Sequence, residues 1–177
     1  MTSRDKIVLF SEDYWGLAWN FQVNPSSCGN HEHYEEYIRL IALDDKRRGK
    51  GVTYAFIRCD KASTELMGYI TLRATSYIEI LDGKTYGSPA LEIFELAVSK
   101  DAERIGIGTD LMKFALSKAL EWKSNVLGIE YITLCSDQKA VPFYEKFEFK
   151  RVDEYGEIPR ESWNTNCVPM FLRLPEL

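Results

Sequence analysis

The sequence predicts a single α/β domain in which helices flank a mixed β-sheet. Runs of β-branched and aromatic residues, typical of strands, alternate along the chain with segments whose apolar residues recur every three or four positions, as in helices. Two pairs of the expected strands resemble hairpins, so the sheet should contain antiparallel as well as parallel pairs. A length of 177 residues favours one domain, and we expect it to span residues 1–177.

Strand-like and helix-like patterns place the elements of this domain along the chain. Strands are expected at residues 7–10, 53–58, 66–80, 91–98, 131–135 and 168–174, and helices at 31–43, 105–123 and 138–147. Asn30 is a suitable N-cap for the first helix, and Asp82-Gly83 should mark a turn or a long hairpin loop between two strands. Residues 11–30 contain many turn formers and are expected to form mostly loop. Pro169 predicts either that the last strand lies at a sheet edge or that this proline is the first residue of the strand.

The composition excludes several classes of protein. Hydrophobic residues make up 45% of the chain and the formal net charge is only -5, which is incompatible with disorder. No apolar run approaches the ~18 residues of a membrane span, and no signal peptide is recognisable, so we expect a cytoplasmic protein that binds no membrane. The acidic balance argues against a broad basic surface for DNA or RNA.

Cysteine and histidine spacings indicate no metal site. The chain has four scattered cysteines without a CxxC pair, and we expect them to be reduced thiols: Cys28, Cys59, Cys135 and Cys167. His31 and His33 are two residues apart on an expected helix, so their side chains should face away from each other. We therefore expect no metal cofactor.

The junction at residues 98–109 is the first feature that indicates chemistry. A buried-looking strand ends at Val98, and a glycine-bearing helix start follows. Unpaired N–H groups and the helix dipole make such a start attractive to anions, and glycines let an anion approach the backbone. Arg104 adds a cation and Thr109 a hydroxyl donor, which suits a pyrophosphate. A dinucleotide fingerprint fails because Leu111 stands where its third glycine belongs, and no GK[ST] of a P-loop follows.

A second motif, combined with this junction, resembles the GNAT superfamily of acyl-CoA-dependent N-acyltransferases. The motif is Ala140-x-x-Phe143-Tyr144-Glu145-Lys146-x-x-Phe149, and one helix and one strand separate it from the glycine-bearing segment. The resemblance covers about residues 52–175. Three positions depart from the family pattern, namely Glu103 for Gln or Arg, Thr109 for a small residue, and Glu148 for glycine.

The resemblance implies a splayed sheet that binds acetyl-CoA as cosubstrate. The backbone of Leu96, Ala97 and Val98 would pair with the pantetheine arm. The pyrophosphate would lie on the segment Arg104, Ile105, Gly106, Ile107, Gly108 and Thr109. Asp137 stands where many members have an asparagine that contacts the cofactor, and Phe143 belongs to the same cofactor-binding set.

Two residues are expected to carry the catalysis. In the family, the tyrosine at the position of Tyr144 protonates the leaving coenzyme A thiolate, and a phenol with a pKa near ~10 is protonated at neutral pH and able to do so. Glu92 lies in an apolar strand, where burial makes a carboxylate a better base, acting directly or through a water. Glu95 is the alternative base. Strict alternation would place it on the opposite face of the strand, although a bulge expected from the family would blur that assignment.

The leading hypothesis is an acetyl-CoA-dependent N-acetyltransferase that modifies an unidentified primary amine. A narrower resemblance, to a bacterial GNAT branch that includes toxins of toxin–antitoxin modules, suggests aminoacyl-tRNA as an alternative acceptor and makes a homodimer plausible. The net charge of -5 disfavours tRNA as the acceptor. The mixed-sign segment 44–51 is either a solvated loop or a local basic patch, and a basic patch could supply part of a tRNA-binding rim. A third alternative is a GNAT fold that binds acyl-CoA but has lost catalysis. An antitoxin partner is neither predicted nor excluded.

Overall fold

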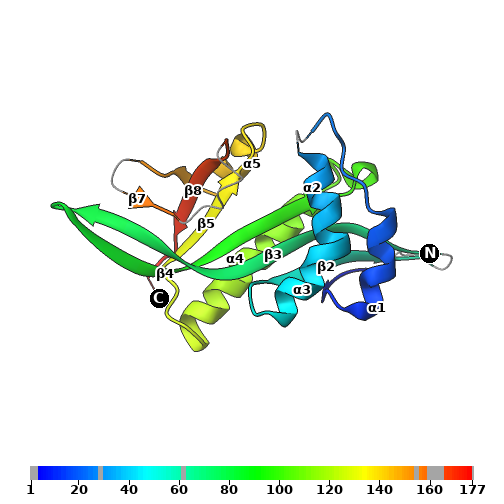
Figure 1. Ribbon diagram of the computed structural model, residues 1–177, viewed down its shortest axis with the longest axis horizontal. Helices are drawn as coiled ribbons and strands as arrows, with labels where there is room; N and C mark the ends of the chain where they lie inside the picture. The colour runs from blue at the N-terminus through cyan, green and yellow to red at the C-terminus, as the bar shows by residue number, and fades with distance from the viewer. Residues whose placement is uncertain (1–3, 28–29, 61–62, 154–155, 159–165, 177) are drawn as a thin grey trace. The chain divides into compact units, whose positions relative to one another are not determined.

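The computed structural model describes residues 4–27, 30–60, 63–153, 156–158 and 166–176. Its strands are β1 (Arg4–Leu9), β2 (Val52–Cys59), β3 (Thr64–Leu81), β4 (Lys84–Val98), β5 (Tyr131–Ser136), β6 (Lys150–Arg151), β7 (Gly156–Glu157) and β8 (Val168–Arg173). They form one sheet in the order β1-β2-β3-β4-β5-β8-β6, and β7 pairs with β3 (Figure 1). The β4–β5 pair is parallel, whereas β1–β2, β2–β3 and β5–β8 are antiparallel. The predicted mixed sheet is therefore confirmed.

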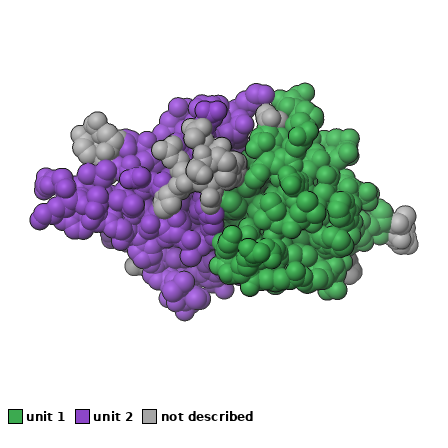
Figure 2. Space-filling model, in the orientation of Figure 1, with its two compact units in different colours: residues 1–72, 94–115 green, residues 73–93, 116–177 purple. Residues whose placement is uncertain are grey.

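The chain divides into two units, which are described separately. Unit 1 comprises residues 1–72 and 94–115, and unit 2 comprises residues 73–93 and 116–177 (Figure 2). The strands β3 and β4 and the helix α4 (Ile107–Asn125) contribute residues to both units. The single domain over residues 1–177 stays a prediction.

Unit 1 has helices on both faces of its part of the sheet. Its helical segments are α1 (Glu12–Trp15), η1 (Gly16–Asn20), α2 (His31–Glu36), η2 (Tyr37–Ile41), α3 (Ala42–Arg47), η3 (Lys100–Ala102) and the first turns of α4. Neighbouring residues of a strand face opposite sides of the sheet. Accordingly, Gly68 faces Ile107 of α4, whereas the ring of Tyr69 stacks on Tyr37 with centroids 6.1 Å apart. Figure 1 shows α2 and α3 across β2 and β3.

The first predicted helix is longer than expected, and the preceding segment is not all loop. Helix α2 begins at His31 after Asn30, as predicted, and continues through the π-helical segment η2 into α3. Residues 11–30 contain two short helices, α1 and η1, which corrects the loop prediction. Ala18 and Phe21 in this segment are almost fully buried, so tertiary packing rather than local periodicity stabilises these turns.

Unit 2 contains the β3–β4 hairpin, the strands β5 to β8 and the short helix α5 (Val141–Glu145). Asp82 and Gly83 both have positive φ, at 51° and 73°, as a two-residue turn requires, so the turn rather than the long hairpin loop is formed. Aromatic rings form the centre of this unit, with centroid separations of 4.5 Å for Tyr77–Tyr131 and 4.8 Å for Tyr77–Phe171. The predicted helix at 138–147 is confined to five residues.

The last strand and its cysteine differ from the sequence-based expectation. Strand β8 lies between β5 and β6, and Pro169 is its second residue, so neither alternative offered for Pro169 is correct. The antiparallel register pairs Cys135 with Pro169, which brings Cys167 to the end of β5. Cys135 and Cys167 form a disulfide with a Cα–Cα distance of 5.4 Å, which corrects the prediction of reduced thiols. Cys59 is a free thiol, and Cys28 lies outside the described residues.

Candidate functional site

The junction between β4 and α4 lies in unit 1 and has the conformation that its glycines require. Arg104 and Gly106 have positive φ angles of 62° and 100°, and α4 begins at Ile107 with the bond from the Asp110 amide to the Gly106 carbonyl, 3.0 Å long. A Cβ placed on Gly106 would meet no atom within 4 Å, so the backbone is open to a ligand on that side. The first amides of α4 have no acceptor within the helix. These features fit an anion such as a pyrophosphate.

The start of α4 is held in place by its close packing on the sheet. An ideal Cβ on Gly68 would lie 2.9 Å from the carbonyl oxygen of Ala97 and 3.1 Å from Cγ2 of Ile107. The amide of Ser99 donates to the carbonyl of Met67, so the end of β4 is tied to β3 as well. The absence of a side chain at Gly68 therefore fixes how closely the expected pyrophosphate segment approaches the sheet.

Glu103, a departure from the family pattern, has a structural contact that the sequence did not reveal. Its Oε2 accepts a hydrogen bond from Nδ2 of Asn24 at 3.1 Å. Asn24 Oδ1 in turn accepts from the amide of Ser26, and the Ser27 amide donates to the Asn24 carbonyl. Glu103 thus links the turn at residues 24–27 to the glycine-bearing junction.

Glu95 and His33 form a contact in unit 1 that joins β4 to α2. Glu95 Oε1 lies 2.7 Å from His33 Nε2, and the side chains are 4% and 23% exposed, respectively. The hydrogen bond to Glu95 raises the pKa of His33 above its ordinary value, against the opposing effect of burial; the charges of Glu95 and Glu36 add to the rise. The sequence drew attention to His33 only as a metal ligand and did not predict this pair.

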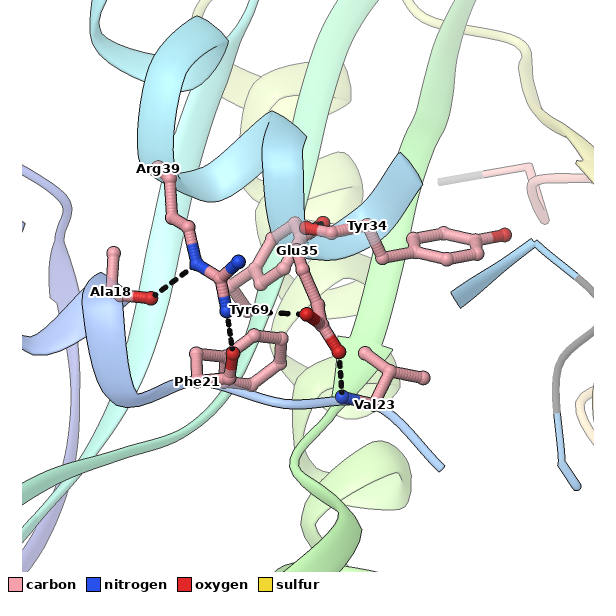
Figure 3. A network of polar contacts seen from close by, with 7 residues as sticks. All are labelled: Ala18, Phe21, Val23, Tyr34, Glu35, Arg39 and Tyr69. Atoms are coloured by element: carbon pink, nitrogen blue, oxygen red, sulfur yellow. Dashed lines mark hydrogen bonds and ion pairs between the residues drawn. The ribbon is translucent and has the colours of Figure 1, made fainter. Parts of the chain in front are cut away.

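A hydrogen-bond network fixes the helix that carries His33 (Figure 3). Arg39 donates to the carbonyls of Ala18 and Phe21 at 3.2 and 2.6 Å and to Glu35 at 3.2 Å. Glu35 accepts from the amide of Val23 at 3.0 Å. These bonds join residues 18–23 to α2 and η2, and so they hold this helix against the preceding segment of the chain.

Glu92 lies in the part of β4 that belongs to unit 2 and is ion-paired. Its Oε2 is 2.6 Å from Nε of Arg73, and the two side chains are 7% and 19% exposed. A guanidinium is always charged and stabilises the ionised form of the carboxylate that it contacts. Glu92 and Glu95, three residues apart, therefore have partners of different chemistry. The sequence did not predict the role of Arg73.

Tyr144 lies in unit 2 at the end of α5, in a Schellman motif. The amide of Phe149 donates to the Tyr144 carbonyl at 3.4 Å and the amide of Glu148 to the Glu145 carbonyl at 3.0 Å, as in that motif. Glu148 has a φ of 66°, which explains why glycine is usual there. The rings of Tyr144 and Phe149 have centroids 6.1 Å apart, and Tyr144 is 8% exposed.

Asp137 precedes α5 and Phe143 lies within it, in the same unit. Asp137 Oδ1 accepts from the amide of Lys139 at 2.8 Å, so its carboxylate stabilises the turn between β5 and α5. The ring of Phe143 packs against Phe147, with centroids 5.3 Å apart. Both residues therefore have structural contacts within unit 2, whatever they bind.

Two absences characterise the described residues. Within them, no cluster of three or more His, Cys, Asp or Glu side chains is arranged to hold a metal ion. Of the helices in this part of the chain, none combines the length and apolar character needed to cross a membrane.

Comparisons with known proteins agree with this architecture. The model of the acetyltransferase (GNAT) family matches residues 19–149. A bacterial toxin structure aligns with 97% of this chain and 92% of its own, at 20% identity and a TM-score of 0.72. The structure of a Tyr-to-Phe mutant of the AtaT toxin aligns with 96% of this chain and 89% of its own, at 16% identity and a TM-score of 0.76. AtaT complexed with acetyl-methionyl-tRNAfMet aligns with 96% of this chain and 95% of its own, at 17% identity and a TM-score of 0.73. No curated protein matches the chain.

Proposed function

Because the chain belongs to the GNAT family of acetyltransferases, we propose that it transfers an acetyl group from acetyl-CoA to a primary amine by direct attack. The family match carries this proposal, since it includes both the glycine-bearing junction and the Tyr144 motif. Similar folds have been solved with acetyl-CoA bound, including complexes of AtaT with its antitoxin AtaR. The acetyl thioester supplies the reactive carbonyl.

We propose that acetyl-CoA is bound by the residues that the sequence predicts. The backbone of β4 at residues 96–98 would hold the pantetheine arm, and the amides from Ile105 to Thr109, with Arg104, would hold the pyrophosphate. The open side of Gly106 and the exposed side chain of Arg104 support this part of the proposal. Asp137 and Phe143 are proposed as further cofactor contacts.

Catalysis in this proposal requires two proton transfers. The amine loses a proton, its nitrogen attacks the thioester carbonyl, and the carbon–sulfur bond breaks. Tyr144 donates its phenolic proton to the departing thiolate. A glutamate of β4 receives the amine proton, with Glu92 as the sequence-based candidate and Glu95 as its competitor.

An unidentified primary amine remains the leading acceptor, and aminoacyl-tRNA is the second candidate. The complex of AtaT with an acetylated aminoacyl-tRNA favours the second candidate. The charge of this chain does not, because Arg47 and Arg48 in segment 44–51 already pair with Glu12 and Asp44. An antitoxin partner is a further proposal, supported by the complexes of AtaT with AtaR, and a homodimer is proposed from the branch resemblance alone. The third candidate function is an acyl-CoA-binding module without catalytic activity.

Acetyl-CoA binding is the first test. At a ligand concentration 100-fold above Kd, binding stabilises a protein by about 2.7 kcal/mol, which corresponds to a rise in melting midpoint of about 5–10 °C at this size. An unchanged midpoint at saturating acetyl-CoA would contradict the enzyme and the binding module together. A panel of polyamines, peptide N-termini, aminoglycosides and aminoacyl-tRNA then identifies the acceptor.

The variant Tyr144→Phe separates an enzyme from a binding module. We expect it to lower kcat by about 100-fold or more while the acetyl-CoA thermal shift is preserved, because only the proton donor is lost. Tyr54→Phe is the matched control, since it removes a phenolic hydroxyl from a ring on β2 that packs against Phe114 and has no role in the proposed site. Equal losses in both variants would refute the assigned role of Tyr144. Absence of wild-type turnover across the whole panel would refute the enzyme.

A further inference from the structure

We propose that His33 is the base that accepts the proton of the acceptor amine, and that Glu95 positions His33 for this step. The inference rests on the proposed N-acetyltransferase function. His33 Nε2 and Glu95 Oε1 are 2.7 Å apart, and Glu95 directly precedes the backbone of residues 96–98 that would hold the pantetheine arm. All of these residues belong to unit 1.

The burial of the two side chains suits a base and its orienting carboxylate. Glu95 is 4% exposed, and a buried carboxylate requires a hydrogen-bonding or charged partner. His33 is 23% exposed, so its ring connects the buried carboxylate with the solvent-accessible side. A carboxylate that holds an imidazole in one tautomer is a recurring arrangement for general bases.

The tautomer follows from the contact with Glu95. An ionised carboxylate only accepts hydrogen bonds, so Nε2 of neutral His33 carries the hydrogen and Nδ1 carries the acceptor lone pair. Proton transfer then breaks an N–H bond of the substrate ammonium and forms an N–H bond at Nδ1. The imidazolium that results is stabilised by Glu95 and later releases its proton to solvent. The neutral amine then attacks the thioester, Tyr144 protonates the departing thiolate, and the second proton that the nitrogen loses on becoming an amide returns to the Tyr144 phenolate.

The groups around His33 favour a cationic amine. Among the described residues, the titratable groups beside His33 include Glu95 from β4, Glu36 and Tyr34 from α2, and Tyr37 from η2. The rings of Tyr34 and Tyr37 have centroids 5.5 and 6.4 Å from that of His33, and aromatic faces attract ammonium groups. Burial holds the pKa of Tyr37 well above its usual range, so this neighbour is neutral.

The position of the imidazole is fixed by the fold. Tyr69 of β3 donates its hydroxyl hydrogen to the carbonyl of Tyr34 at 2.8 Å, which attaches the backbone next to His33 to the sheet (Figure 3). Arg39 and Glu35 hold the same helix to residues 18–23. A base needs such support, because small displacements of a catalytic group lower the rate strongly.

Glu92, the alternative base, is less suited to accept a proton. Its partner Arg73 is a permanent cation at 2.6 Å, which stabilises the carboxylate and makes it a weaker base. The partner of Glu95 is instead a group that changes its charge near neutral pH. Of the two glutamates, Glu95 is therefore the one connected to a proton acceptor.

The test is the pH dependence of kcat at saturating amine and acetyl-CoA. His33→Gln keeps an amide that can contact Glu95 but removes the acceptor, so kcat should fall by about 100-fold or more and its ascending limb should disappear. The wild-type limb should lie above pH 6.5, because Glu95 raises the pKa of His33 from that value. Glu95→Gln should move the limb to lower pH. His31→Gln is the matched control and should leave kcat unchanged.

A direct titration complements the kinetics. The chain has only two histidines, so NMR of the His31→Gln variant follows His33 alone. A midpoint above 6.5 that falls when Glu95→Gln is added supports the pair. A folded His33→Gln variant that keeps kcat within about threefold, or an unshifted limb in Glu95→Gln, overturns the inference. If Tyr144→Phe still abolishes turnover in that case, the proposed function stands; if no amine is acetylated by the wild type, both fail.

Discussion

The close packing of Gly68 under the start of α4 predicts a large effect of a single added methyl group. In Gly68→Ala, the new Cβ would lie 2.9 Å from the carbonyl oxygen of Ala97, 3.1 Å from Cγ2 of Ile107 and 3.2 Å from Cδ1 of Leu111. The first of these contacts is with backbone, which cannot rotate away as a side chain does. Either the strands or α4 must therefore move.

The size of the effect follows from the tightness of these contacts. An extra methyl group in a packed interior destabilises by about 1–3 kcal/mol, which corresponds to a fall in melting midpoint of about 2–12 °C at this chain length. The displacement would also reach the ligand site, because Ile107 is the first residue of α4 and its neighbours are proposed to bind the pyrophosphate. We therefore expect the KM for acetyl-CoA to rise.

Urea unfolding of Gly68→Ala and Gly87→Ala is the appropriate assay. Gly87 also lies in a strand, but a Cβ there would meet nothing within 4 Å, so the same substitution should change the free energy of unfolding by less than about 0.5 kcal/mol. If Gly68→Ala is as stable as wild type, or both variants lose equal stability, the close approach of α4 to β3 is refuted.

Three further substitutions test other parts of the structure by urea unfolding. Glu148→Gly should stabilise the protein by about 1 kcal/mol, because glycine relieves the strain of a φ of 66°; a loss of stability would contradict the motif. Thr53→Val should destabilise it by about 1 kcal/mol, since it removes the buried 2.8 Å bond between the hydroxyls of Thr53 and Thr71; an unchanged stability would rule out that bond. The raised pKa of His33 contributes stability that is present below pH 6.5 and lost as the pH rises through the raised value, so unfolding at pH 6 and 8 should differ less in Glu95→Gln.

Most of the fold could be predicted from the sequence, because burial imposes different periods on strands and helices. The apolar face of α4 is an example, because Leu111, Ala115 and Ala119 recur every four residues and are fully buried. Residues 11–30 lack such a period, because their short turns are held by contacts with residues distant in sequence. The Cys135–Cys167 disulfide was missed for a related reason: the two residues meet only through the register of β5 with β8.

In the candidate site, too, the local motif could be predicted from the sequence, whereas contacts between distant residues could not. The Tyr144 motif is local, and the structure supplies its physical basis: a left-handed residue at Glu148 and a ring contact between Tyr144 and Phe149. Local spacing therefore carries this motif even where the family's glycine is replaced. The pairs Asn24–Glu103 and His33–Glu95 join residues 79 and 62 positions apart, and no pattern within one segment predicts them.

Glu92 and Glu95 show why a site requires the fold as well as the motif. In the sequence both are carboxylates in one apolar strand, and burial alone would assign them the same raised basicity. In the structure one meets a guanidinium that keeps its charge at every accessible pH, and the other meets an imidazole that gains or loses a proton near neutrality. Only the second pair contains a group whose ordinary pKa lies near neutral pH. We therefore expect the identity of the partner, rather than the burial of the carboxylate, to decide which glutamate takes part in proton transfer.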